Sequence, residues 1–475
     1  MKWFWMLVAV AVLSSPGCVT KRVDLRRELG AFDVEIVTTP QGCRADEQDP
    51  CPYSTDPVTI SVTIKALRPD GSIDTDFNDA VAISLVPAGM WPQDAQGVYP
   101  SPGGQQVLMV TLNQGVVENY SVPFRSAFGR VQLIVEDIGY RPRQVSNECL
   151  ANGVDCPACW QGGSGLLPLG CFNQDDDNPA AGTGAVGVSR DLFFDNPRVA
   201  DLQRVDEFHI DESPLAGFRV EVDGDDPLEF SDLSDCIDGQ GDVRQLLVVT
   251  AVTNSGFYVT DVCNNGGPAL APDTWREFGS IYAFNFNSPE GLRTGDCLLW
   301  FQGGQDDFYG FTELKNPAWS DPVCAPDQSG CMPACTAFLP EPAVLDAATI
   351  NDDLSMEELE SSLVAVQDGV VGRMEICDKN DNGQIDFDNQ EENDCKRSCD
   401  RDPSCWVYES YTDYFQFTVN VDGAEVAVTL QGVVAFDPRD HQGQPISYVA
   451  GTLKHLSFGG PPWIVMPRNS DDFRE

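Results

Sequence analysis

The stretch RQLLVVTAVTNSGFYVTDV (residues 244–262) determines how the middle of the chain folds. Two runs rich in β-branched and aromatic residues flank the tripeptide Asn254-Ser255-Gly256, and two such runs around a short turn are typical of a β-hairpin. Further strand-like stretches follow in the order SIYAFNF, LRTGDCLLWFQGG and DFYGFTEL. We therefore expect a β-rich module here, which we place at residues 187–340.

A second module of the same kind is predicted at residues 341–475. It opens with LSMEELESSLVAVQDGVV (residues 354–371), in which Ser355 and Glu358 have capping-box spacing, so one or two helical turns are expected before a strand from Leu363. Strand-like stretches resume in YFQFTVNVDGAEVAVTLQGVV, SYVAGTLKHL and WIVMPRNSDDF. An acidic, cysteine-rich insertion at residues 377–405 separates the two parts.

The N-terminal part of the chain has the strand pattern of a sandwich. Apolar and polar residues alternate from Val58 to Ala66, and the same period of two recurs from Val81 to Leu85 and from Val131 to Val135. Turn-forming residues separate these stretches, which predicts a β-sandwich over residues 31–140. Residues 141–186 show no such period and are rich in Cys, Gly and Asp, which indicates a stapled linker.

These modules resemble known families. Residues 31–140 resemble an immunoglobulin-like module of bacterial surface proteins, through VTIKALRPDGSIDTDF, VTLNQGVVENYSVPF and GRVQLIVED. The two later modules resemble the OB-like barrels found beside the catalytic domains of extracellular nucleases and in exported lipoproteins. In the first copy the resemblance rests on Gly256, Phe257, Tyr258, Asp261, Gly295, Asp296 and Gly310. The second copy ends in the pattern W-x-x-x-P-R-x-x-x-D, formed by Trp463, Pro467, Arg468 and Asp472.

The first residues look like an export signal. An apolar run from Trp3 to Leu13 follows Lys2, which is the length of a signal-peptide core and too short for a transmembrane helix. The following SSPGC resembles a lipobox, which implies cleavage after residue 17, lipidation of Cys18 and a tether over residues 18–30. An ordinary secretory signal is the alternative. Val19 after the lipid-modified cysteine implies an outer-membrane or cell-surface location.

The cysteine count agrees with export. Of the 17 cysteines, 16 remain when Cys18 is set aside, and an even number in an exported chain indicates disulfides. Closeness in the sequence suggests three pairs: Cys43 with Cys51, Cys236 with Cys263, and Cys377 with Cys395. A zinc site or a redox motif around Cys156 and Cys159 is a weaker alternative.

The sharpest local motif is CDKNDNGQIDFDNQEENDC (residues 377–395), which has calcium-loop spacing. Gly383 occupies the tight-turn position, but position 12 is Asn389 where a glutamate is usual, and Glu391 or Glu392 would replace it only in a longer loop. We predict no flanking helix pair, and a structural role for the ion. The expected ligands are Asp378, Asn380, Asn382, Gln384 and Asp386. The alternative is an acidic loop without an ion.

Charge and missing motifs narrow the function. The chain carries 74 acidic against 29 basic residues, a net charge of −45, which disfavours nucleic-acid binding because that binding depends on cationic contacts. Common nucleophile, phosphate-loop and metalloprotease motifs are absent, and the three histidines show no metal-site spacing. We therefore expect no catalysis and no catalytic cofactor. The expected function is that of a lipid-anchored binding, adhesion or envelope-assembly component with an unidentified protein or glycan partner. An exported hydrolase or its accessory subunit, and a purely structural envelope protein, are the alternatives.

Overall fold

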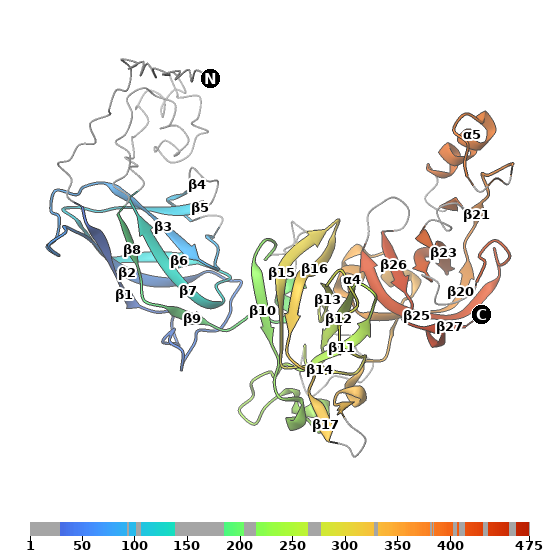
Figure 1. Ribbon diagram of the computed structural model, residues 1–475, viewed down its shortest axis with the longest axis horizontal. Coiled ribbons are helices and arrows are strands. Elements are labelled where there is room, and N and C mark those ends of the chain that lie inside the picture. Colours follow the sequence, from blue (N-terminus) through green and yellow to red (C-terminus); the bar gives the residue numbers. More distant parts are fainter. Residues whose placement is uncertain are drawn as a thin grey trace, which may run out of the picture. The chain divides into compact units, whose positions relative to one another are not determined.

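A computed structural model describes residues 29–92, 95–100, 106–137, 185–203, 215–264, 277–326, 331–380, 382, 384–401, 406–407, 414–430, 436–455 and 462–474. The chain forms two compact units, residues 1–194 and residues 195–475. Both are built mainly from strands (Figure 1). The predicted fold class, mainly β with a sandwich followed by OB-like barrels, is confirmed.

The first unit is a sandwich of two sheets. One sheet has the order β1-β2-β6, with β1 (Ala31–Thr38), β2 (Val58–Leu67) and β6 (Val116–Phe124). The other has the order β4-β5-β3-β7-β8, and β9 also pairs with β7. Its strands are β3 (Ala80–Val86), β4 (Val98–Pro100), β5 (Gln106–Thr111), β7 (Gly129–Glu136), β8 (Val186–Val188) and β9 (Leu192–Phe194).

The period of two in the sequence explains how the sandwich buries its core. Ile60, Val62 and Ile64 of β2 are fully buried, because alternate residues of a strand face the same side of a sheet. β8 and β9 belong to this unit through their pairing with β7, so the sandwich reaches residue 194 and takes in residues that we had assigned to the next module. The predicted linker at residues 141–186 falls almost wholly outside the described residues.

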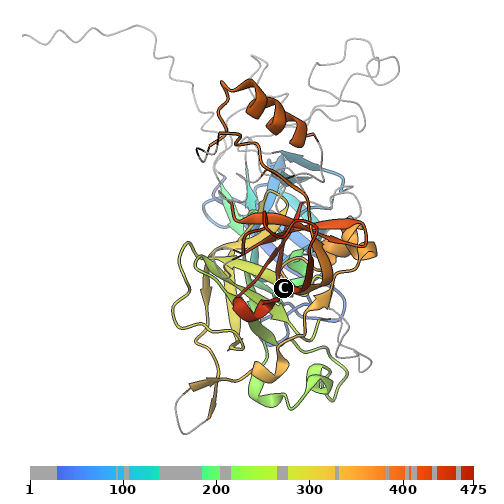
Figure 2. The ribbon, with the colours of Figure 1, turned by 90° about the vertical axis from the view of Figure 1, so that its right-hand side faces the viewer.

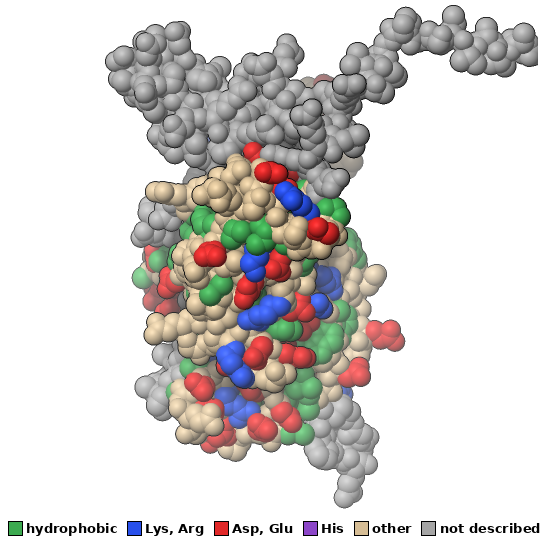
Figure 3. Space-filling model, turned by 90° about the vertical axis from the view of Figure 1, so that its left-hand side faces the viewer, with side chains coloured by type: hydrophobic (Ala, Val, Ile, Leu, Met, Phe, Trp, Pro, Cys, Tyr) green, Lys and Arg blue, Asp and Glu red, His purple; other side chains and the backbone are tan. Residues whose placement is uncertain are grey.

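The surface of the first unit mixes charges of both signs. Figure 3 shows acidic and basic side chains interspersed on the face that it presents. Two clusters of ion pairs contribute: Lys65 with Asp33 and Glu35, and Arg68 with Asp74 and Asp76. On this unit, basic side chains therefore neutralise part of the negative charge that the excess of acidic residues gives the chain.

The C-terminal half of the second unit is a closed five-stranded barrel, drawn in orange and red in Figure 2. Its order is β20-β23-β24-β26-β25, and β25 pairs back with β20. β24 and β26 run parallel, whereas the other pairs in the ring are antiparallel. The strands are β20 (Leu363–Val371), β23 (Gln416–Val421), β24 (Ala424–Thr429), β25 (Pro445–His455) and β26 (Trp463–Met466). In chain order this is 1-2-3-5-4, the OB-like arrangement that was predicted.

The other half of the second unit repeats this order. β11, β12, β13, β16 and β15 follow one another in the sheet, and β13 and β16 are again the parallel pair. β14 pairs with β11 and precedes β15 by a single residue, so it brings the fourth strand back to the first. The strands are β11 (Leu247–Val252), β12 (Gly256–Asp261), β13 (Ser280–Phe284), β14 (Cys297–Leu298), β15 (Trp300–Phe308) and β16 (Phe311–Trp319).

The first strand of this barrel is interrupted. β10 (Arg219–Asp223) pairs with β15 so that Asp223 faces Trp300, and the Gly224 N–H bonds to the carbonyl of Leu299. Leu247 of β11 then faces Leu298, the next residue along the partner strand. Residues 225–246 therefore loop out between two positions that are adjacent in the ladder, and we call this segment the strand-1 excursion. A side chain at Gly224 would meet the Leu298 carbonyl oxygen at 2.7 Å, which explains the glycine there.

Disulfides involve the segments that lie between or after the strands of both barrels. The structure contains the three predicted pairs, Cys43–Cys51, Cys236–Cys263 and Cys377–Cys395. A fourth pair, Cys297–Cys335, was not predicted. Cys236, Cys263, Cys297 and Cys335 pack in one apolar cluster, so these two bridges attach the excursion and the segment after β16 to the core of the first barrel.

The predicted helical turns before the last barrel are present as α4 (Asp353–Glu358). The capping residue is Asp352, whose carboxylate accepts the Ser355 N–H at 3.2 Å, so the helix begins earlier than the capping-box prediction placed it. α4 carries Glu357 and leads into the junction between the two barrels.

Candidate functional site

The two barrels of the second unit meet through buried polar contacts. The tip and second strand of the β15–β16 hairpin supply most of them. The Thr312 N–H donates to Glu360 Oε2 at 3.1 Å, and the carbonyl of Gly310 lies 2.8 Å from His455 Nδ1. The Ser362 hydroxyl donates to Ser280 Oγ at 3.0 Å. Because such contacts need both partners to be in place, they fix one barrel against the other.

Lys454 of β25 lies among aromatic and acidic groups of the first barrel. Its Nζ is 4.8 Å from the ring centroid of Phe311 and 5.8 Å from that of Tyr282. Burial lowers the pKa of Lys454 and raises the pKa of Glu313, although their mutual attraction opposes both changes. Burial thus dominates for both groups, which is how charged groups behave when they are taken out of water.

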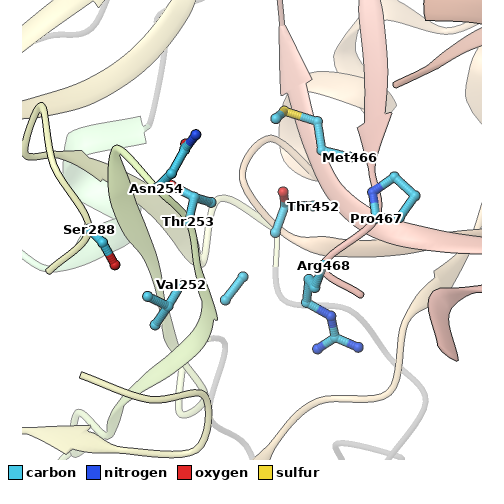
Figure 4. A pocket seen from close by; sticks show the side chains of 9 residues that line it. Val252, Thr253, Asn254, Ser288, Thr452, Met466, Pro467 and Arg468 are labelled. Carbon is cyan, nitrogen blue, oxygen red and sulfur yellow. The ribbon is translucent and has the colours of Figure 1, made fainter. Parts of the chain in front are cut away.

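A cavity of about 400 Å³ opens at this junction (Figure 4). On one side it is lined by the β11–β12 turn and Ser288, and on the other by β25 and the end of β26. The lining residues are Ala251, Val252, Thr253, Asn254, Ser288, Thr452, Met466, Pro467 and Arg468. Clefts of this size between modules are common places for a ligand.

The closing motif of the chain builds one wall of the cavity. Arg468 donates from Nε and Nη2 to the two carboxylate oxygens of Asp472, both at 2.9 Å, and from Nη1 to the carbonyl of Thr250 at 3.3 Å. A bidentate pair of this kind has a fixed geometry, so Arg468 ties the last strands to the first barrel. Its charge is neutralised by Asp472, and the rest of the lining is uncharged.

An aromatic side chain lies in the same loop as the cavity residue Ser288. Phe286 is 65 % exposed and packs against Phe284 with ring centroids 4.4 Å apart. The loop is attached to the β11–β12 turn through the Asn285 N–H, which bonds to the carbonyl of Ser255 at 2.8 Å. Other aromatic residues of this barrel are divided: Tyr258, Tyr282, Phe301 and Phe311 are buried in the core, whereas Phe308 and Tyr309 are exposed.

The predicted calcium ligands converge in the acidic loop. Asp386 Oδ2 accepts hydrogen bonds from Asn380 Nδ2 and from Asn382 Nδ2, both at 3.0 Å. Asp378 Oδ1 and Asn380 Oδ1 both accept the Asn382 N–H, at 3.1 and 3.0 Å. Gln384 donates its N–H to Asn382 Oδ1 at 2.9 Å. The expected ligand residues thus lie close together, and the turn glycine at 383 lies outside the described residues.

Glu392 is the acidic side chain that closes this loop. It is fully buried, and its two oxygens accept the N–H groups of Lys379 at 3.1 Å and Asp386 at 2.8 Å. Asn389, which has the usual position of the last ligand, instead caps helix α5 (Gln390–Cys399). A single helix, α5, follows the loop directly, and the strand β21 (Met374–Glu375) precedes it.

The predicted export signal and lipidation site are not covered by the structure. Cys18 and the export signal lie outside the described residues. Among the described residues, no helix has the length and apolar character needed to cross a membrane. His441 Nδ1 lies 2.9 Å from the carbonyl of Asp437, and its ring stacks on Phe436.

One group of potential metal ligands was not predicted from the sequence. Glu357, Glu360 and His455 bring potential ligand atoms within 4.8 Å of one another. The only local signal is the short spacing of the two glutamates, because His455 comes from a distant strand.

Comparisons with known proteins add no assignment. No known protein family matches the chain, and no curated protein is significantly similar to it.

Proposed function

We propose that the protein is a lipid-anchored, non-catalytic binding component of a bacterial cell envelope, and that the cavity at the barrel junction binds a neutral glycan. The export signal and the paired cysteines support a location outside the cytoplasm. The observation that carries the binding site is the cavity itself, because residues of two barrels form it and buried contacts hold those barrels together.

The lining of the cavity favours a hydroxyl-rich, uncharged ligand. Thr253, Asn254 and Ser288 offer hydrogen-bond donors and acceptors, and the single charged side chain, Arg468, is already paired with Asp472. The strongly negative chain opposes polyanions. The exposed ring of Phe286 offers a flat apolar face for a sugar ring.

The test is binding to polysaccharide isolated from the native cell envelope. The mature protein, purified in detergent with its anchor, should bind in a saturable way. Asn254→Ala and Phe286→Ala should each weaken binding at least fivefold. Tyr414→Ala is the matched control, because Tyr414 is also 65 % exposed and is not part of the loop that contributes Ser288 to the cavity.

Two outcomes would overturn this function. One is equal binding by all three variants. The other is turnover in a panel of glycosidase and nuclease substrates that a single Asp or Glu substitution abolishes, which would support the exported hydrolase instead.

We also propose that the acidic loop binds a structural calcium ion. Asp378, Asn380, Asn382, Gln384 and Asp386 supply oxygen ligands, and Glu392 is placed to complete the set in a loop that is longer than the usual one. Lipidation of Cys18 is tested separately by mass spectrometry of the mature N-terminus, which should show an acylated cysteine as the first residue. A free α-amino group on an unmodified Cys18 would contradict the anchor.

A further inference from the structure

A group of three titratable side chains lies buried at the barrel junction and has no part in the proposed cavity. Glu357 of α4, Glu360 of the following segment and His455 of β25 have exposed fractions of 4, 0 and 9 %. One potential ligand atom from each lies within 4.8 Å of the other two. Two carboxylates in a site that excludes water need a cation or protons to balance their charge.

The imidazole of His455 is held in the form that a metal ligand requires. Its Nδ1 lies 2.8 Å from the carbonyl oxygen of Gly310, and because a carbonyl only accepts, Nδ1 carries the proton. In the neutral ring the lone pair is then on Nε2. Stacking on Trp463, with centroids 4.4 Å apart, fixes the plane of the ring. Histidines that bind metals commonly donate their other nitrogen to a carbonyl in this way.

Glu360 has an oxygen atom that the described residues do not satisfy. Oε2 accepts the Thr312 N–H, whereas the buried Oε1 has no partner at hydrogen-bonding geometry among the residues that the structure describes, and the Gln203 side chain only weakly favours the charged form of this carboxylate. The negative charges of Glu357 and Asp307 also act on Glu360. Lys454 supplies positive charge, but Glu313 shares it. A buried, unpaired carboxylate oxygen next to other acids is unfavourable unless a cation or a proton binds it.

We propose that Glu357, Glu360 and His455 bind a zinc ion that fastens the C-terminal barrel to the β15–β16 hairpin. A set of one imidazole and two carboxylates suits zinc better than calcium, which prefers oxygen alone. Ligand atoms around a tetrahedral zinc ion lie roughly 3.3 Å apart, so atoms within 4.8 Å need only small side-chain movements to bind it. Glu360 and His455 also hydrogen-bond to Thr312 and Gly310 of the β15–β16 hairpin. An ion that binds both side chains would therefore strengthen the junction between the two barrels.

The test uses the full mature protein in detergent, stripped with a chelator and then titrated with zinc in excess calcium, so that the acidic loop is saturated. We expect one zinc per chain by elemental analysis and a higher melting temperature. Cobalt in place of zinc should give the intense visible absorption of a tetrahedral site. Glu360→Gln and His455→Gln should each weaken zinc binding at least tenfold.

His441→Gln is the matched control, since it removes a histidine outside the cluster and should leave zinc binding unchanged. If the cluster binds protons instead, the stripped wild type will take up no zinc. Zinc uptake that is unchanged in both Glu360→Gln and His455→Gln would equally overturn the proposal. If either variant fails to fold, Glu357→Gln and the cobalt spectrum of the wild type still decide the matter.

Discussion

The two barrels of the second unit share one strand order but accept their additions in different places. In the first barrel the excursion at residues 225–246 interrupts strand 1, and the ladder resumes without a missing pair. In the C-terminal barrel strand 1 is continuous, and the addition comes after it, between β20 and β23, where it carries the acidic loop. The comparison teaches that the strand register defines the barrel, and that disulfide-stapled segments are tolerated wherever they leave this register intact.

The largest effect should come from the junction, because both barrels depend on it. Lys454→Met removes the larger of the two positive influences on the buried Glu313, leaving Lys315, and we expect a loss of up to about 3–5 kcal/mol, the cost of removing one partner of a buried charge pair. The double variant Lys454→Met/Glu313→Gln should recover at least about a third of that loss, since it removes the unpaired charge as well. Guanidinium unfolding of the chelator-treated protein measures the unfolding free energies of Lys454→Met, Glu313→Gln and the double variant relative to the wild type. Strictly additive losses would show that the two side chains are not coupled.

The next largest loss of stability should come from removing a disulfide, and it should differ between the strand-1 excursion and the acidic segment. Cys236 and Cys263 lie in the core of the first barrel, 27 residues apart, so replacing both with serine should cost about 2–4 kcal/mol. Cys377 and Cys395 hold a segment outside the barrel ring, so the same change there should lower the melting temperature of the barrels by much less. Calorimetry of the two double variants tests the order. Equal losses would mean that the acidic segment stabilises its barrel as strongly as the excursion stabilises the other.

Calcium should act on the addition to the C-terminal barrel and not on the excursion. With calcium, the melting transition should rise by a few degrees, in line with the stabilisation that a ligand gives at concentrations well above its Kd. Asp386→Ala should abolish this shift, because Asp386 lies at the centre of the converging side chains. Asp242→Ala, in the excursion, is the control. A shift that survives in Asp386→Ala would contradict the calcium site.

The smallest effect concerns pH. Asp296 precedes β14 in the first barrel, is fully buried, and accepts the Arg293 N–H at 2.6 Å, yet burial raises its pKa above the usual value of 3.8. The folded state then holds this proton more tightly than the unfolded chain, so stability falls as the pH rises from about 3.9 through the raised pKa. Asp296→Asn should remove this part of the pH dependence, measured as the difference in unfolding free energy from the wild type between pH 4 and 7. A constant difference across that range would contradict it.

Local patterns were readable from the sequence, whereas contacts across the junction were not. Alternation in β2 and the turn at Asn254 predicted strands, and nearness predicted three disulfides. Nearness failed for Cys297–Cys335, because the hairpin of β17 (Cys324–Pro326) and β18 (Cys331–Pro333) places two other cysteines between them.

The site residues also divide into those that local sequence predicts and those that depend on contacts between distant parts of the chain. Spacing predicted the acidic loop, but the role of Glu392 depends on where α5 begins, which spacing does not reveal. His455 and Gly310 are 145 residues apart, so their contact follows from how the barrels pack and leaves no local pattern.

The most direct test of the central claim, a glycan site at the barrel junction, is oxidative footprinting at Met466, which lines the cavity. Envelope polysaccharide should slow oxidation of Met466 severalfold in the wild type and much less in Asn254→Ala, while Met90, which is half-buried like Met466 but lies outside the cavity, should oxidise at the same rate throughout. Equal oxidation of Met466 with and without saturating polysaccharide would contradict the account.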